Sequence, residues 1–232
     1  MTQPTSGTYN FQPSLGELAL YVLGVLVGVP NTAITQEHMT AFRMVANLVA
    51  TRWSSKGVNL WAVDLQTIPL VQGTATYTVP SNTIVMLDTY ITTTQGSSTT
   101  NRLILPVSRS EYASYANPTQ AGFPTVYWFD RLLAPTVTFW PVPDGNEVSA
   151  SYYRVRYLQD SNLTDAAIPE MPLYFLDAFA LECAWRLSIR WAKDKVAMLK
   201  EMAAEAYTDA SAQNVETAQQ YISPMLGSYF RP

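Results

Sequence analysis

The sequence predicts an α+β protein in which N- and C-terminal helices form a helical bundle that carries an inserted β-rich domain. Two observations lead to this fold class. Apolar residues recur at helical spacing in residues 14–57 and 169–210, whereas residues 58–168 contain short alternating segments separated by Gly and Pro. Because amphipathic helices must bury their apolar faces, we expect the two terminal blocks to pack together. The middle block is expected to form an antiparallel sandwich or a barrel-like domain.

The first helix is predicted to begin at Ser14. Residues 1–13 are polar and lack periodicity, which is typical of a flexible arm. Ser14 is followed three residues later by Glu17, the spacing of a capping box. The apolar run then continues to about Val29, and Pro30 ends the helix.

A second helix is predicted from Thr35 to Lys56. Glu37 falls in its first turn, where an acidic side chain interacts favourably with the helix dipole. Gly57 follows at the position where many helices end in a left-handed residue. Extended, aromatic-rich sequence begins at Val58, so we expect this helix to lead directly into the sheet.

The middle block contains alternating segments that are typical of short strands. The turn-forming run Phe139–Gly145, FWPVPDG, separates the last two of them. The polar run Gln95–Asn101 predicts an exposed loop, and Ser108 with Glu111 predicts one short helix. The candidate strands are Val63–Leu70, Ala75–Val79, Ile84–Thr93, Asn101–Pro106, Thr125–Phe129, Thr136–Trp140 and Val148–Arg156.

The third block is helical again, after the loop that Pro172 ends. The helical phase changes before Val196, which predicts a bend near Lys193 and Asp194, with one long curved helix as the alternative. The apolar face before the change consists of Leu173, Leu176, Phe179, Ala180, Cys183, Leu187 and Trp191. Cys183 is therefore expected to be a buried hydrophobe and not a nucleophile.

Composition limits the classes of function. Hydrophobic residues make up 48% of the chain. Charged residues make up only 14%, whereas a charged fraction of about a quarter is typical of soluble proteins. Part of the surface is therefore expected to meet partners. The net charge of −4 argues against a protein that grips the phosphate backbone. The apolar stretch Leu18–Val29 is shorter than the roughly 18 residues of a membrane span, so we predict no membrane insertion and no signal peptide.

Motifs for known chemistry are missing from the sequence. There is no zinc, nucleotide-binding or serine-hydrolase signature, and the single cysteine permits no disulfide within the chain, which fits a reducing cytoplasm. His38 is expected to be exposed or to cap a helix. We therefore predict no cofactor, no metal and no catalytic residue. Glu170, Asp177 and Glu182 come nearest to a carboxylate pair, which keeps a wall-cleaving glycosidase as an alternative. A β-rich binding module is a third reading.

Four motifs in series resemble one family. They are R-W-x-x-K-G-x-N-L-W from Arg52, Q-T-I-P-L-x-x-G-x-x-x-Y-x-x-P from Gln66, F-W-P-x-P-D-G from Phe139, and D-A-F-A-L-E-C-A-W-R-L from Asp177. Together they resemble the head-to-tail adaptor proteins, or head completion factors, of tailed phages, especially short-tailed phages. The resemblance extends from about Ser14 to Lys200.

This resemblance implies a structural virion protein and not an enzyme. It implies a dodecameric ring beneath the portal protein, in which each copy contacts two neighbours. Such a ring would seal packaged DNA in the head and provide the attachment surface for a downstream tail or nozzle protein. DNA would pass through the ring without sequence-specific binding. The protein would be made in the cytoplasm of the host bacterium.

Two groups of residues are candidates for the partner interface. Residues 211–232 are expected to form an extended docking tail, whose anchors are Tyr221, Met225, Leu226, Tyr229 and Phe230. The alternative is that this tail packs back on its own domain. The second group is a basic helix face of Arg186, Arg190 and Lys193 at i, i+4 and i+7 spacing, either a solvated face or a surface for acidic partners.

Overall fold

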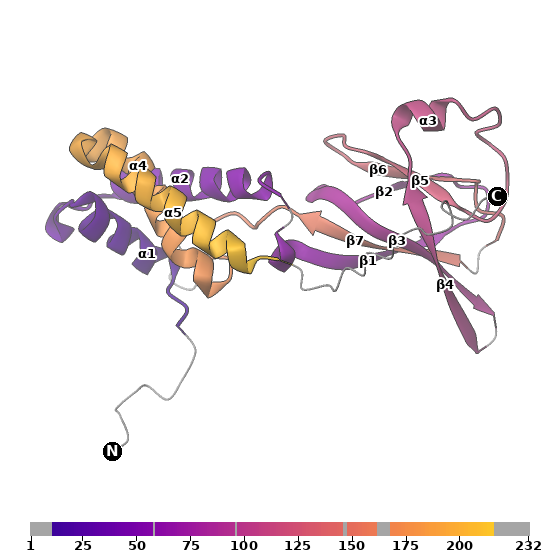
Figure 1. Ribbon diagram of the computed structural model, residues 1–232, viewed down its shortest axis with the longest axis horizontal. Coiled ribbons are helices and arrows are strands. Elements are labelled where there is room, and N and C mark those ends of the chain that lie inside the picture. The colour runs from indigo at the N-terminus through magenta and orange to yellow at the C-terminus, as the bar shows by residue number, and fades with distance from the viewer. Residues whose placement is uncertain (1–10, 58, 96, 146–147, 162–167, 216–232) are drawn as a thin grey trace, which may run out of the picture.

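Helices occupy one end of the molecule and a β-sheet occupies the other (Figure 1). The computed structural model describes residues 11–57, 59–95, 97–145, 148–161 and 168–215. The N-terminal helices and the C-terminal helices lie side by side, although most of the chain separates them in sequence. The α+β class is therefore confirmed, and the strands lie between the two helical segments in sequence.

The first helical segment begins with the predicted capping box. Helix α1, Leu15–Tyr21, starts where Glu17 N donates to Ser14 Oγ at 3.2 Å and Ser14 N donates to Glu17 Oε2 at 2.8 Å. The α-helix is shorter than predicted, because it continues as a π-helix, η1, over Val22–Val27. Gly28 ends it with a φ of 91°, a left-handed conformation that glycine adopts without a steric penalty.

The last carbonyl groups of the π-helix accept hydrogen bonds from a side chain far along the sequence. Lys195 Nζ donates to Leu26 O at 3.2 Å and to Val27 O at 3.1 Å. A cation at the C-terminal end of a helix interacts favourably with the helix dipole and satisfies its last carbonyls. Lys195 therefore holds the N-terminal and C-terminal helical segments together.

Helix α2, Gln36–Ser54, is the longest helix of the N-terminal segment and follows the 3-10 turn η2, Asn31–Ala33. His38 Nδ1 accepts a hydrogen bond from Thr35 N at 3.2 Å, which confirms its capping role. The helix ends at Ser54, with Ser55 as its C-cap, and not at Lys56 as predicted. Gly57 therefore does not follow the helix directly, but its φ of 136° is positive, as predicted, and favours glycine.

All seven predicted strands are present, with boundaries that differ by a few residues. After the 3-10 turn η3, Leu60–Ala62, they are β1 Val63–Leu70, β2 Thr76–Thr78, β3 Thr83–Gln95, β4 Ser98–Pro106, β5 Val126–Asp130, β6 Thr136–Trp140 and β7 Val148–Arg156. The predicted short helix is α3, Arg109–Ala113, and its N-cap Ser108 accepts from Glu111 N at 3.1 Å.

The strands form one curled sheet, a half-barrel in the order β1-β7-β3-β4-β5-β6-β2. The predicted two-sheet sandwich is therefore wrong. The curled sheet is closer to the barrel-like alternative. One pair also departs from the antiparallel prediction, because Leu105 and Pro106 at the end of β4 run parallel to Val126 and Tyr127 of β5. Strand β4 is long enough to pair with β3 along its first part and with β5 at its end.

The predicted loop Gln95–Asn101 is also wrong, because strand pairing continues through most of it. Thr92 lies opposite Asn101, and Thr92 Oγ1 donates to Asn101 Oδ1 at 2.9 Å. Threonine favours extended backbone, and the ladder hydrogen bonds of a hairpin need no apolar side chains. Strands β3 and β4 therefore project beyond the rest of the sheet as a polar hairpin (Figure 1).

The C-terminal segment contains η4 Leu173–Phe175, α4 Leu176–Trp191, η5 Lys193–Lys195 and α5 Val196–Gln213. Ala192, with φ −151° and ψ 66°, interrupts the helix between α4 and α5. The predicted bend is confirmed, and the single long helix is wrong. Helix α5 ends at Gln213, so it includes the first three residues of the predicted docking tail, 211–232.

Each end of the molecule has its own hydrophobic core. In the helical end, Trp53 of α2 packs against the rings of Phe175, Phe179 and Tyr207 at centroid distances of 5.5, 5.9 and 5.2 Å. This core draws on α1, η1, α2, α4 and α5. The sheet has a second core that includes Tyr127 and Phe139. Neither cluster includes a residue of the other.

We predict that Gly57→Val lowers the free energy of unfolding by about 1 kcal/mol or more, because a β-branched residue is strained at this φ. A Cβ at Gly57 would meet no atom within 4 Å, so the loss would come from the backbone alone. Gly145→Val is the matched control, since that Cβ also meets nothing and Gly145 is not among the positive-φ residues. Urea unfolding of both variants measures the difference, and equal values would contradict the prediction.

Candidate partner-binding surfaces

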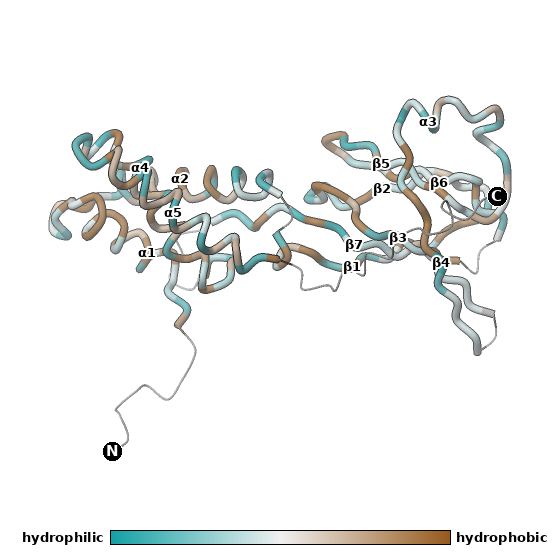
Figure 2. The backbone as a smooth tube through the Cα atoms, in the orientation of Figure 1, coloured by the Kyte–Doolittle hydropathy of each residue, from teal (hydrophilic) through white to brown (hydrophobic). Residues whose placement is uncertain are grey.

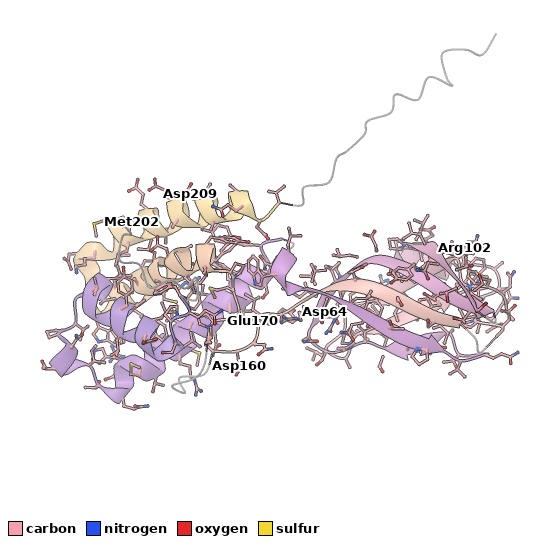
Figure 3. The ribbon with its side chains drawn as sticks, turned by 90° about the horizontal axis from the view of Figure 1, so that it is seen from below. Asp64, Arg102, Asp160, Glu170, Met202 and Asp209 are labelled. Carbon is pink, nitrogen blue, oxygen red and sulfur yellow. The ribbon has the colours of Figure 1, made fainter. Side chains whose placement is uncertain are left out.

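A polar network joins the sheet to the helical end, and we call it the neck (Figure 3). On the sheet side of the neck, Arg154 of β7 is 5% exposed and binds β1 and the start of β3. Arg154 Nε and Nη2 donate to the two carboxylate oxygens of Asp64 at 2.7 and 3.1 Å, and Nη1 donates to Asn82 Oδ1 at 2.7 Å and Thr83 Oγ1 at 2.8 Å. The hydrogen bond from Arg154 outweighs burial and holds the pKa of Asp64 below its usual value.

Glu170 extends the neck onto the segment that leads to α4. It forms an ion pair with Arg156 of β7, and Glu170 Oε2 accepts from Gln159 N at 2.8 Å. Burial alone would raise the pKa of Glu170, but the hydrogen bonds from Arg156 and Gln159 and the charge of Arg156 lower it overall. In Figure 3, Asp64 and Glu170 lie on the two sides of the constriction between sheet and helices.

Main-chain groups after β7 are held by side chains of α2. Ser161 N donates to Asn47 Oδ1 at 2.5 Å, and Leu158 N donates to Ser54 Oγ at 3.3 Å. These bonds satisfy backbone groups that leave the sheet ladder. The chain therefore passes from the sheet to the helices along α2, and the position of the sheet depends on polar contacts at the neck.

The predicted basic face divides into parts with different surroundings. Arg186 Nη2 lies 2.9 Å from Glu182 Oε1, and Arg52 Nη1 of α2 lies 2.9 Å from the same oxygen. The side chain of Glu182 is only 10% exposed. Two arginines thus neutralise a nearly buried carboxylate, and Arg52 links α2 to α4 through it.

The other two members of the basic face lie nearer to solvent. Arg190 Nη2 pairs with Glu37 Oε1 at 2.5 Å, and the two side chains are 64% and 60% exposed. Lys193 lies beyond the break at Ala192, so the helical spacing that placed it on one face with Arg186 does not hold. Arg190 and Lys193 are exposed, whereas Arg186 is partly buried.

The predicted tail anchors Tyr221, Met225, Leu226, Tyr229 and Phe230 lie outside the described residues. The structure describes the point from which they depart. Asn214 Oδ1, just after α5, accepts from Leu60 N at 3.2 Å. Val215 follows and is 63% exposed. The tail therefore starts beside the first residues of the sheet.

Two of the three carboxylates considered for catalysis form ion pairs with arginine. Glu170 and Glu182 are engaged by arginines, as described above, while Asp177 borders an open cavity of about 620 Å³ with Phe11 and Tyr21. Burial raises the pKa of the Cys183 thiol far above its usual value, so it is a poor nucleophile. Over the described ranges, no group of three or more His, Cys, Asp or Glu side chains is placed to hold a metal ion, and no helix is long and apolar enough to cross a membrane.

A groove with apolar walls lies between the sheet and the end of α5. Its walls include Leu103 and Leu105 of β4, Tyr153 of β7 and Val215, and its volume is about 1080 Å³. The apolar stretch of β4 is visible in Figure 2 as a brown segment above the polar hairpin. Leu103 and Leu105 are 61% and 62% exposed, which is unusual for strand leucines.

A second apolar feature is the tip of the hairpin between β5 and β6, where Leu133 is fully exposed and Leu132 is 59% exposed. The groove and the tip were both missed by sequence reasoning. The signal for the tip was present, since two leucines stand where a turn normally carries polar residues. The groove had no such signal, because its walls come from segments far apart in sequence.

Exposed apolar surfaces of this kind, on a weakly charged chain, are typical of proteins that bind partners. Comparison with known proteins identifies the family. Residues 29–226 match the family described as SU10 adaptor protein. Because the match covers most of the chain, the protein belongs to this family of phage head–tail adaptors, and the predicted resemblance is confirmed. A search of curated proteins found no match.

Membership of this family carries general conclusions. The adaptors are structural phage proteins and not a known enzyme family. The protein is accordingly a virion component that interacts with portal and tail proteins in general.

We expect Arg154→Met to lower the free energy of unfolding by about 2 kcal/mol, because it removes the hydrogen bonds of a buried guanidinium group to Asp64 and leaves the buried Thr83 hydroxyl without its donor. Arg190→Met is the matched control. It removes an ion pair whose side chains are both exposed, so its cost should stay below about 1 kcal/mol. Urea unfolding measures the loss of stability in both variants. If Arg154→Met costs no more than Arg190→Met, the bonds of Arg154 do not stabilise the fold.

Protonation of the neck carboxylates should lower the stability of the fold in acid. Asp64 and Glu170 both have a folded pKa below the unfolded value of about 4, so their contribution is complete above that pH and is lost as the pH falls through the folded pKa. Urea unfolding from pH 6 to pH 3 should therefore show a steeper decline for the natural chain than for the variant with Asp64→Asn and Glu170→Gln.

The control for this titration is Asp209→Asn, which changes an exposed carboxylate on α5 (Figure 3). Its decline should match that of the natural chain. Glu17, whose pKa is lowered by its bonds with Ser14, is present in every variant and contributes equally. If the double variant and the natural chain lose stability in parallel, the neck carboxylates are not the cause.

Proposed function

We propose that this protein is a head-to-tail adaptor that forms a ring beneath the portal of a phage head, seals the packaged DNA and offers the attachment surface for a downstream tail or nozzle protein. The observation that carries the proposal is the family match over residues 29–226. By the resemblance of its motifs, the ring is dodecameric. The chain is made in the bacterial cytoplasm and acts in the virion.

The two-ended shape supports an adaptor role. The helical end, for which we propose a bundle arrangement, and the sheet end have separate cores. Each end can therefore keep its fold while it meets a different partner. A closed ring of identical chains also needs two different patches on each copy that fit each other. The charge of −4 fits a ring through which DNA passes without being gripped.

The C-terminal tail is the proposed portal contact. Residues 216–232 can reach roughly 55 Å when extended at about 3.3 Å per residue, which is far enough to cross onto another chain. Tyr221, Met225, Leu226, Tyr229 and Phe230 are its anchors. A tail that becomes ordered on binding gives up part of its affinity but covers a large surface.

The basic residues have a secondary place in this proposal. Arg190 and Lys193 are exposed at the end of α4 and can meet acidic groups of the portal or of a neighbouring adaptor. Arg186 contributes indirectly, since its partner is Glu182 of the same helix. We propose that Arg186 positions α4 and does not itself touch the partner.

Removal of residues 216–232 should leave the fold intact and abolish stable binding to portal. Truncation after Val215 keeps α5 and the bond between Asn214 and Leu60, so cooperative unfolding should be retained. Portal binding by sedimentation should weaken at least about 100-fold, since several aromatic anchors are lost.

The control is the full chain with Tyr221, Tyr229 and Phe230 changed to serine, which keeps the length of the tail. It should bind as weakly as the truncated chain. If the truncated chain binds portal as tightly as the natural chain, the tail has no docking role, and the exposed residues Arg190 and Lys193 become the next candidates. If neither the natural chain nor any variant binds portal, the adaptor proposal itself is wrong.

A further inference from the structure

The two leucines at the tip of the β5–β6 hairpin are not buried by any part of the chain that the structure describes. Leu133 is 100% exposed and Leu132 is 59% exposed, and both follow the exposed Arg131. The tip is the brown turn beside the β5 label in Figure 2. Turns of this kind usually contain polar residues or glycine, which are well solvated. Two adjacent leucines instead present a compact apolar projection that suits insertion into a complementary site.

The same chain offers a recess of matching chemistry. The groove beside β4 has Leu103, Leu105 and Tyr153 in its walls, exposed by 61%, 62% and 41%. Its volume of about 1080 Å³ is at the upper end of the range of small-molecule sites and is ample for two leucine side chains. The leucines of the tip are exposed, so they do not fill the groove of their own chain.

The tip and the groove also have opposite charges. Arg131 stands directly before the two leucines, and Asp88 lies on the wall of the groove. Both are exposed, and neither forms an ion pair with any residue that the structure describes. When the tip enters the groove of another copy, these opposite charges can pair at its edge and select the orientation.

We propose that Leu132 and Leu133 insert into the groove of the next copy of this chain and thereby form the interface between neighbouring subunits. This inference rests on the proposed ring, because only an assembly of identical chains brings a tip to a groove. The contact is heterologous, with a different patch on each side, so every copy gives one tip and receives one tip. Where the rotation between neighbouring copies closes, repetition of that contact gives the proposed ring.

Cross-linking tests the contact. The chain with Leu133→Cys and Leu103→Cys is treated with a short bis-maleimide at high protein concentration and should give a ladder of covalent oligomers. Cys183 is fully buried and will not compete. A mixture of the two single-cysteine chains should stop at dimers. The matched control is Leu133→Cys with Val71→Cys, since Val71 is 53% exposed but lies outside the walls of the groove, and it should give no ladder.

Charge variants of the cross-linking chain test the orientation. Arg131→Asp should lower the yield of the ladder about tenfold, because it places two acids together, and Asp88→Arg in the same chain should restore it. All of these positions are exposed, so thermal unfolding should be unchanged and serves as the check on folding.

The absence of a ladder from the Leu133 and Leu103 pair, or an equal ladder from the Val71 control, overturns the inference. So does a monomeric cross-link between Leu103→Cys and Tyr229→Cys, which would give the groove to the tail of its own chain. Portal binding is measured separately. Binding without tip-to-groove cross-links would refute this interface alone, whereas cross-linked rings that ignore portal would refute the adaptor function and leave the interface standing.

Discussion

The position of the sheet relative to the helices depends on a few polar contacts that cross the neck, first among them the ion pair between Arg156 of β7 and Glu170. Because the two hydrophobic cores do not merge, no shared apolar surface sets the angle between them. Arg154 holds β1, β7 and the start of β3 together on the sheet side. The link to the helical end is made by Arg156 with Glu170 and by the bonds from Ser161 N to Asn47 and from Leu158 N to Ser54. Directional bonds of this kind define an orientation more narrowly than apolar packing does, because each depends on angle as well as distance.

The ion pairs of this protein are concentrated at contacts between its elements. The chain is only 14% charged, yet arginine and carboxylate groups recur where elements must be held together. Examples are Arg156 with Glu170 at the neck and Arg52 with Glu182 between α2 and α4. The surfaces that remain weakly charged, such as the groove and the hairpin tip, are then available for apolar contacts with other chains.

Local signals predicted the features that depend on neighbouring residues. The capping box at Ser14, the glycine at position 57 and the break near Lys193 each depend on a few adjacent residues, and each is present. Long-range pairing was less accessible. The continuation of β3 and β4 through the polar run Gln95–Asn101 depends on the two strands meeting, and alternation of apolar residues does not reveal it.

The candidate site was predictable only in part for the same reason. The basic residues Arg186 and Arg190 were found by spacing, but Glu182 and Glu37, which pair with them, become visible only when helices are packed. The groove combines β1, β3, β4, β7 and the end of α5, so no single stretch of sequence describes it. The one local clue that was overlooked is the leucine pair at the β5–β6 turn.

The way the chain enters and leaves the sheet determines how a mechanical load would travel through the molecule. The start of β1 and the end of β7 lie side by side at the neck, joined there by the pairing of Val63 with Val155. A pull along the long axis is therefore shared by two adjacent strands, and β7 passes it on to β3 across a second ladder. Hydrogen bonds that run across the direction of pull are loaded together in shear, so they resist as a group and do not open one at a time.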